Sequence, residues 1–132
     1  MVSEAERYSI LITDDDRGCQ EVLRDIMEPE GFRTLLASSG EEALDIVRDE
    51  AVDLLLMDVQ LPRLSGLETL QLVRQINALL PCILVTAGAD DRLLRLACQA
   101  RAFSVIPKPV SKHVVLYTVV RALGRRYRGG RG

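Results

Sequence analysis

The most restrictive feature of this sequence is a repeated unit in which a short apolar segment, a polar loop and an amphipathic helical pattern follow one another. The short lengths of the apolar segments and their Ile, Leu and Val content are typical of strands covered on both faces of a parallel sheet. Five such units within 120 residues predict a three-layer α/β fold with right-handed crossovers. The predicted strands are Tyr8–Thr13, Phe32–Ala37, Val52–Met57, Cys82–Thr86 and Phe103–Ile106.

Helical patterns fill the spaces between these strands. In each, apolar side chains recur at the spacing of one helix face. Pro29 and Gly31 end the first helix, a capping-like Ser39–Glu42 begins the second, and the fifth stops near Gly124. The predicted faces are Val22, Leu23, Ile26 and Met27; Ala43, Leu44 and Val47; Leu67, Leu70, Val73, Arg74 and Ile76; Leu93, Leu94, Ala97 and Cys98; and Val115, Leu116, Val119, Val120 and Leu123.

The length and composition are typical of one globular domain. The chain has 132 residues, of which 48% are hydrophobic and 27% charged. We expect the domain at residues 8–123, an N-terminal extension at 1–7, and an Arg/Gly tail at 124–132 that is a disordered end or the start of a linker. The longest apolar run, Leu54–Met57, is far too short to cross a membrane, and no secretory signal is expected. The cytoplasm is therefore the expected location.

Charge is distributed unevenly along the chain. Residues 1–120 hold all 19 acidic residues against 12 basic ones, whereas residues 121–132 hold five arginines and no acid. An acidic body argues against nucleic-acid binding by this domain. We interpret the basic tail as a solvated end.

The cysteines do not form a recognisable ligand or disulfide pattern. Their number is odd, their spacing contains no CxxC motif, and His113 is the only histidine. We therefore expect neither disulfides nor a zinc site, and interpret all three as small, reduced packing residues. The cysteines are Cys19, Cys82 and Cys98.

The polar residues that follow the predicted strands suggest a chemistry. Asp14–Asp16 follow the first strand, Asp58 follows the third, Thr86 ends the fourth, and Lys108 comes shortly after the fifth. These strand ends meet at one edge of a doubly wound sheet, where ligands bind. Neighbouring carboxylates repel unless a cation joins them, and Mg²⁺ prefers carboxylate and phosphate oxygens. A carboxylate can attack phosphorus, and a metal, an ammonium and a hydroxyl would stabilise the phosphoryl oxygens.

In these motifs the sequence resembles the receiver domain of bacterial two-component response regulators, over residues 8 to about 123. The motifs occur in the order of that family and at the corresponding strand ends. The resemblance implies a flavodoxin-like sheet with the strand order 2-1-3-4-5. The segments that carry it are Ile10–Asp16, Leu56–Pro62, Ser65–Leu67, Val85–Ala87 and Lys108–Pro109.

The resemblance also implies how the acidic residues are used. Asp58 would be the phosphoacceptor. Asp15 would ligate Mg²⁺ directly, Asp14 would help to hold it, and Asp58 and the backbone carbonyl of Gln60 would be further ligands. Mn²⁺ is a second candidate for the same site. The phosphoryl donor would be a sensor histidine kinase or a phosphotransfer protein.

The same resemblance assigns roles at the fourth and fifth strands. The Thr86 hydroxyl would bond to a phosphoryl oxygen, Lys108 would pair with the phosphoryl group, and the Lys108–Pro109 bond would be cis. Such a domain is a signalling switch rather than an enzyme, with only self-phosphorylation and autodephosphorylation activity. It acts on an output domain or effector that the sequence does not identify, and receivers often form homodimers through their fourth and fifth helices.

Three residues depart from the pattern of that family. Val105 stands where receivers usually carry an aromatic ring that swings inward with the Thr, so the usual coupling from Thr86 to the fourth-helix surface is an open question. Val110 stands where Phe commonly follows Lys-Pro. Pro107 lacks a backbone N–H, so the fifth strand either pairs imperfectly or lies at the sheet edge.

Two other functions fit parts of the sequence. One is a pseudo-receiver that binds a partner without phosphorylation, which Val105 and Val110 keep open. The other is a phosphohydrolase of the haloacid dehalogenase type, because Asp14–Asp16 contain a DxD pattern. Gly18, however, falls where that class has Thr or Val, and the chain has no room for its usual cap.

Overall fold

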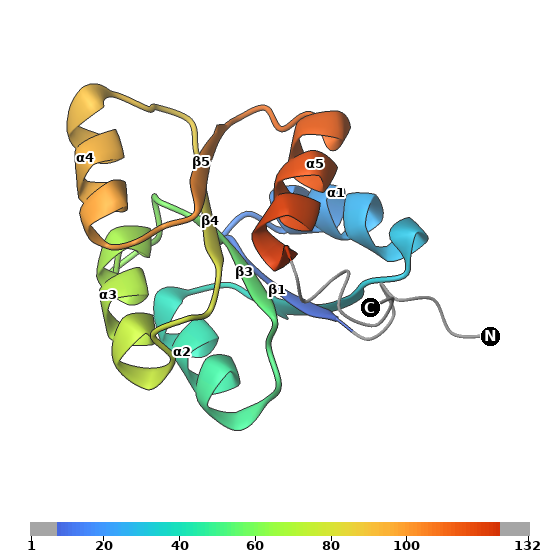
Figure 1. Cartoon of the computed structure of the whole chain (residues 1–132), viewed down its shortest axis with the longest axis horizontal. Coiled ribbons are helices and arrows are strands. Elements are labelled where there is room, and N and C mark those ends of the chain that lie inside the picture. The colour runs from blue at the N-terminus through green and yellow to red at the C-terminus, as the bar shows by residue number, and fades with distance from the viewer. Residues whose placement is uncertain (1–7, 125–132) are drawn as a thin grey trace.

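The computed structural model describes residues 8–124 and shows a five-stranded sheet between two layers of helices (Figure 1). All neighbouring strands are parallel, and their order across the sheet is β2-β1-β3-β4-β5. The predicted three-layer, flavodoxin-like topology is therefore confirmed. The strands are β1 (Ser9–Thr13), β2 (Arg33–Ala37), β3 (Leu54–Asp58), β4 (Cys82–Thr86) and β5 (Ser104–Pro107).

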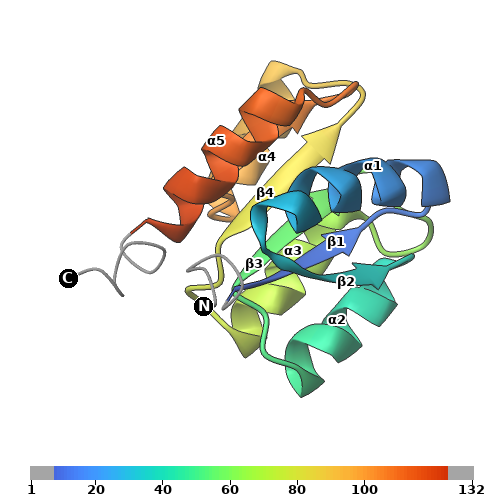
Figure 2. The ribbon, with the colours of Figure 1, turned by 90° about the vertical axis from the view of Figure 1, so that its right-hand side faces the viewer.

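The helices divide between the two faces of the sheet. Figures 1 and 2 show α1 and α5 on one face, with α2, α3 and α4 on the other. Each layer encloses its own apolar core, which explains why the central strands have no polar face. The helical segments are α1 (Arg17–Met27), the short 3-10 turn η2 (Glu28–Glu30), α2 (Gly40–Asp49), α3 (Gly66–Ile76), α4 (Asp91–Gln99) and α5 (Lys112–Leu123).

Alternation along the strands feeds both cores. In β1, Ile10 and Ile12 pack beneath α1 and α5, while Leu11 packs beneath the opposite layer. Every residue of β1, β3 and β4 is buried. A strand covered on both faces needs apolar side chains at odd and even positions alike, so continuous apolar runs identified these strands correctly.

Polar caps begin the helices just beyond the strand ends. The Ser39 hydroxyl accepts the Glu42 N–H, which confirms the predicted start of α2. Ser65 and Glu68 form a reciprocal capping box at α3. Asp16 caps α1 with its carboxylate, and Asp90 caps α4 in the same way. The loops therefore have defined geometry at the edge where the polar residues gather.

Some predicted core positions are wrong. Val22 is 49% exposed and Leu94 46%, and Cys98 is exposed as well. The reason is that each helix contacts the sheet along a narrow stripe. Side chains at the margin of that stripe stay exposed to solvent. The packing role predicted for the cysteines therefore fails at Cys98 and holds for the fully buried Cys82.

The fifth strand lies at the edge of the sheet, as the Pro107 argument allowed. Pro107 is in register with Thr86, and the Lys108 N–H donates to the Thr86 carbonyl at 2.7 Å. The missing N–H of Pro107 therefore does not interrupt pairing with β4.

Two further predictions concern the ends of the chain and membranes. The extension at 1–7 and nearly all of the tail at 124–132 lie outside the described residues. Within residues 8–124, no helix is both long and apolar enough to cross a membrane.

Candidate phosphorylation site

The first part of the site is the loop that follows β1. Asp14 is only 1% exposed, and its N–H donates to the carbonyl of Ala37, which extends the pairing of β1 with β2. One Asp14 carboxylate oxygen, Oδ1, accepts the Asp16 N–H at 2.9 Å. Asp16 in turn accepts the Gly18 N–H as the cap of α1. Asp15 lies between these two residues and is exposed.

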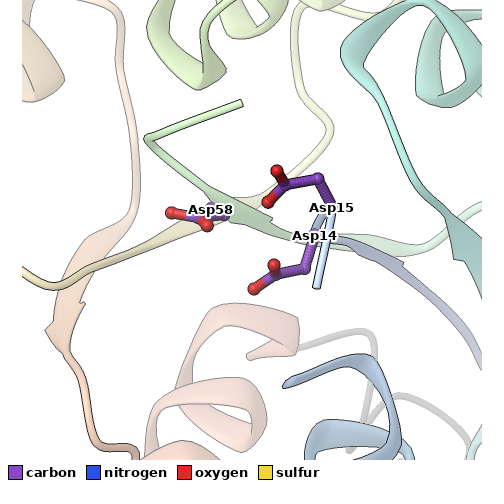
Figure 3. A group of neighbouring side chains, drawn as sticks. All are labelled: Asp14, Asp15 and Asp58. Carbon is purple, nitrogen blue, oxygen red and sulfur yellow. The ribbon is translucent and has the colours of Figure 1, made fainter. Parts of the chain in front are cut away.

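Asp58 reaches the same place from the end of β3. Its side chain is buried, and its Oδ1 accepts the N–H of Gln60 at 3.0 Å. Ligand oxygens of Asp14, Asp15 and Asp58 all lie within 4.8 Å of one another. Figure 3 shows the three carboxylates side by side, two from the segment after β1 and one from β3. The structure thus brings together the acidic residues that the sequence singled out.

Lys108 provides the nearest positive charge. Its Nζ lies 3.0 Å from Asp14 Oδ2 and 3.0 Å from Asp58 Oδ2. Burial favours the neutral amine, but the hydrogen bonds to these two carboxylates outweigh it and raise the pKa of the Lys108 ammonium above its ordinary value. Lys108 is therefore a permanent cation at neutral pH, shared between two buried acids.

The acidic residues fit a hard divalent cation. Three carboxylates and one ammonium leave an excess of negative charge at one point, and their oxygens are the donors that Mg²⁺ prefers. Asp14, Asp15 and Asp58 are the residues that would hold it. The role of the Gln60 carbonyl stays a prediction, because the described contact of Gln60 with this cluster is through its N–H.

Thr86 stands at the end of β4 with its side chain buried. Its hydroxyl oxygen accepts the Gly88 N–H at 3.1 Å, so the proton of the hydroxyl is available to another acceptor. Thr86 lines a hollow of about 210 Å³ together with Gln60, Gly88 and Arg92. Its walls come from the segments that follow β3 and β4 and from α4. The phosphoryl contact predicted for Thr86 stays a prediction.

A second, larger hollow lies on the α1 side of the site. Its volume is about 690 Å³, and Cys19, Val22, Lys108 and Val110 are among the residues that line it. It was not predicted, because it forms where α1, the end of β4 and the β5–α5 loop meet in the folded chain. The Lys108–Pro109 bond beside it is cis, as the family resemblance implied.

Gly66 and Val105 show how neighbouring segments pack around the cluster. A Cβ atom at Gly66 would run into the Asp58 carbonyl oxygen, so glycine lets the first turn of α3 approach the Asp58 backbone. Val105 is half-buried and packs against the core beneath α2, α3 and α4.

Two polar residues with clear structural roles were missed. Gln20 is buried on α1 and donates its side-chain amide to the loop that carries Asp14. Arg74, on α3, donates to the carbonyls of Leu80, Ala100 and Arg101. Arg74 lies on the predicted apolar face of its helix, and its charge there was the available signal. Gln20 lies one helical turn before Leu23, just outside the predicted face of α1.

Acids after β1 and at the end of β3, together with a lysine after β5, therefore lie at one edge of a parallel α/β sheet. Residues 10–120 match the response regulator receiver domain family. The chain belongs to this family and is a receiver domain of the two-component response regulators. The family match also disfavours the haloacid dehalogenase alternative.

The chain matches relatives of different lengths, and it covers a different share of each. CpxR, a transcriptional regulatory protein of Escherichia coli K12, is 38% identical over 117 residues, which cover 89% of this chain and 49% of CpxR. DivK, a polar-differentiation response regulator of Brucella ovis, is 36% identical over 122 residues, which cover 88% of this chain and 96% of DivK. The chain thus spans about half the length of CpxR and nearly all of DivK.

Solved structures agree with the fold. A CheY-like receiver domain protein from Methanospirillum hungatei JF-1 superposes with a TM-score of 0.87 at 28% identity, covering 92% of this chain and 98% of the other. The non-phosphorylated HemR receiver domain from Leptospira biflexa gives a TM-score of 0.82 at 27% identity, covering 89% and 94%.

Proposed function

We propose that this domain is a signalling switch that is phosphorylated on Asp58 in the presence of Mg²⁺. The observation that carries the proposal is the convergence of Asp14, Asp15 and Lys108 on the Asp58 carboxylate. We assign the donor role to a sensor histidine kinase or a phosphotransfer protein, in keeping with the family, and place the reaction in the cytoplasm. Mn²⁺ would serve in place of Mg²⁺.

In the proposed reaction, a carboxylate oxygen of Asp58 attacks the phosphorus atom of a phosphohistidine. The new P–O bond forms as the P–N bond breaks, and the electron pair of that bond stays with the imidazole nitrogen, which takes up a proton. Lys108 is already within hydrogen-bond distance of Asp58 and would pair with a phosphoryl oxygen. Mg²⁺ held by Asp14, Asp15 and Asp58 would supply further charge neutralisation.

The Thr86 hydroxyl would donate to another phosphoryl oxygen. Because its oxygen already accepts the Gly88 N–H, the hydroxyl can make this bond without losing its present partner. The chain would then work as a switch, with no catalysis beyond its own phosphorylation and dephosphorylation. Val105, in place of an aromatic ring, would transmit the change by small shifts in packing.

The proposed output surface is the face formed by α4, β5 and α5. Several large apolar side chains are exposed there, and such side chains mark contact sites when they gather on one face. The partner would be an output domain or a separate effector, and a homodimer through α4 and α5 is one form that this contact could take. The exposed residues are Leu94, Leu96, Phe103, Val114 and Tyr117.

Intact mass after incubation with acetyl phosphate and Mg²⁺ tests the proposal. We expect the wild-type chain to gain one phosphoryl group, and Asp58→Asn or a sample in EDTA to gain none. Asp45→Asn, an exposed aspartate on α2, is the matched control and should behave as wild type.

Other outcomes point to the other functions. No modification, together with no binding of Mg²⁺ or beryllofluoride, would leave a phosphorylation-independent binding domain of the pseudo-receiver kind. Sustained turnover of a generic phosphate ester would indicate a phosphohydrolase. Either result would contradict the proposed switch.

A further inference from the structure

Gln20 is a buried polar residue of α1 that the proposed reaction does not use. Its side-chain Nε2 carries two N–H donors and lies 2.6 Å from the Asp14 carbonyl oxygen, 3.0 Å from the Ala37 carbonyl oxygen and 3.2 Å from the Ser38 hydroxyl oxygen. We infer that Gln20 is a positioning residue for the divalent cation, because it fixes the peptide that carries Asp15. This inference rests on the proposed function.

The environment of Gln20 determines which atom faces the loop. Two carbonyl oxygens and a hydroxyl oxygen surround the same side-chain atom, and only the amide nitrogen can donate to the carbonyls. The side chain is 6% exposed, so water cannot readily replace it. The amide therefore joins the ends of β1 and β2 at the point where the acidic loop begins.

The Asp14 carbonyl and the Asp15 N–H belong to the same planar peptide unit. A hydrogen bond to that carbonyl fixes the orientation of the plane, and hence the direction in which the Asp15 side chain leaves the backbone. The backbone N–H of Gln20 also donates to the Asp16 carbonyl at 3.1 Å. One residue of α1 thus holds the loop on both sides of Asp15.

Asp15 needs this support more than the other two acids. Asp14 and Asp58 each have Lys108 and a backbone N–H as partners. Among residues 8–124, none makes a hydrogen bond or ion pair with the Asp15 carboxylate. Its position depends on its backbone alone. Substitution of a residue that orients a metal ligand through a hydrogen bond commonly lowers metal affinity by 10- to 100-fold.

The test measures metal affinity rather than activity. Gln20→Met keeps the length of the side chain but removes its donors, and Gln71→Met, at an exposed position of α3, is the matched control. Loss of the free Mn²⁺ signal in electron paramagnetic resonance gives the Mn²⁺ affinity, and competition gives the Mg²⁺ affinity. Thermal melting in EDTA measures stability separately. Asp15→Asn shows whether the measured cation occupies this site.

We expect Gln20→Met to bind Mn²⁺ and Mg²⁺ about 10-fold more weakly, and Gln71→Met to match wild type. Gln20→Leu provides a second donor-free variant if Gln20→Met does not fold. An unchanged affinity in a folded variant would overturn the inference, even if melting shifts, because Gln20 would then serve stability only. Failure of both variants to fold in EDTA would overturn it for the same reason.

The proposed function and this inference can fail separately. If wild type binds the cation through Asp15 but Asp58 gains no phosphoryl group, the function fails, while a weaker affinity in Gln20→Met still supports the positioning role. If wild type is phosphorylated and Gln20→Met binds the cation normally, only the positioning role fails. If wild type binds no cation, both are contradicted.

Discussion

The two helices that flank the acid cluster are held in very different ways. On one side, α1 buries Gln20, Leu23, Ile26 and Met27, and its capped first turn fixes the Asp14–Asp16 loop. On the other side, α4 buries only Ala97. Both helices are amphipathic in sequence, so the difference comes from their positions. The first packs against β1, β2 and α5, whereas α4 packs against the edge strand β5.

This difference fits two separate tasks. A cation site needs ligands held in fixed positions, which a well-packed helix and a fully bonded loop supply. A switching element must be able to move at low cost, and poorly buried segments open most easily. We therefore associate the α1 side with cation binding and the α4 side with output. Arg74 restricts the movement of α4, because it holds the C-terminal end of that helix through the Ala100 and Arg101 carbonyls.

The largest expected effect compares the packing of the two helices directly. Leu23→Ala removes a side chain that is 3% exposed and should lower the free energy of unfolding by about 3 kcal/mol. Leu94→Ala removes one that is 46% exposed and should cost less than about 0.5 kcal/mol. Urea unfolding measures both. Equal losses would show that α4 is as firmly packed as α1.

A second pair of substitutions separates cation binding from phosphorylation. Asp15→Asn should weaken Mg²⁺ binding about 100-fold, equivalent to about 2.7 kcal/mol, because a charged ligand is lost. Thr86→Val keeps the shape of the side chain and should leave Mg²⁺ affinity within about twofold, while slowing phosphorylation at least about 10-fold. Calorimetric titration and the rate of mass gain are the measurements. A large change in Mg²⁺ affinity in Thr86→Val would contradict the separation of cation binding from phosphorylation.

Arg74 tests how the α4 side is anchored. Arg74→Met removes three hydrogen bonds from a half-buried guanidinium and should lower the free energy of unfolding by about 2 kcal/mol. Arg95→Met, at an exposed position of α4, is the control and should stay within about 0.5 kcal/mol of wild type. Hydrogen exchange at Ala100–Ala102 should speed up in Arg74→Met. Unchanged exchange there would mean that other contacts hold this end of α4.

The smallest effect is the pH dependence that comes from Lys108. Its pKa is raised in the folded state, so its stabilising contribution is complete below the pKa of an unfolded lysine, about 10.4, and is lost as pH rises toward the folded value. In EDTA at pH 8, Lys108→Met should unfold about 1.5 kcal/mol more easily than wild type. That difference should shrink above about pH 10.

Lys112→Met changes the only other lysine of the sequence and serves as the control. It should neither lower the free energy of unfolding at pH 8 nor alter its dependence on pH. Urea unfolding between pH 8 and pH 11 measures all three chains. A difference between wild type and Lys108→Met that persists unchanged to pH 11 would contradict the assigned ion pairs.

Several features of the site were predictable from the sequence alone. Asp14, Asp58, Thr86 and Lys108 follow or end strands that are nearly continuous apolar runs, and parallel strands bring such ends to one edge. The prediction that Val22 and Leu94 are buried was wrong. Spacing along a helix shows which residues share a face, but not how wide a stripe of that face the sheet covers.

By itself the sequence determined the order of strands and helices, the strand-end acids and the edge at which they gather. These depend on the alternation of apolar segments and caps along the chain, which are local properties. Only the tertiary structure decided that Gln20 supports the Asp15 peptide and that Arg74 anchors α4. Both roles depend on carbonyls brought together from separate segments, and backbone acceptors carry no signature in a sequence.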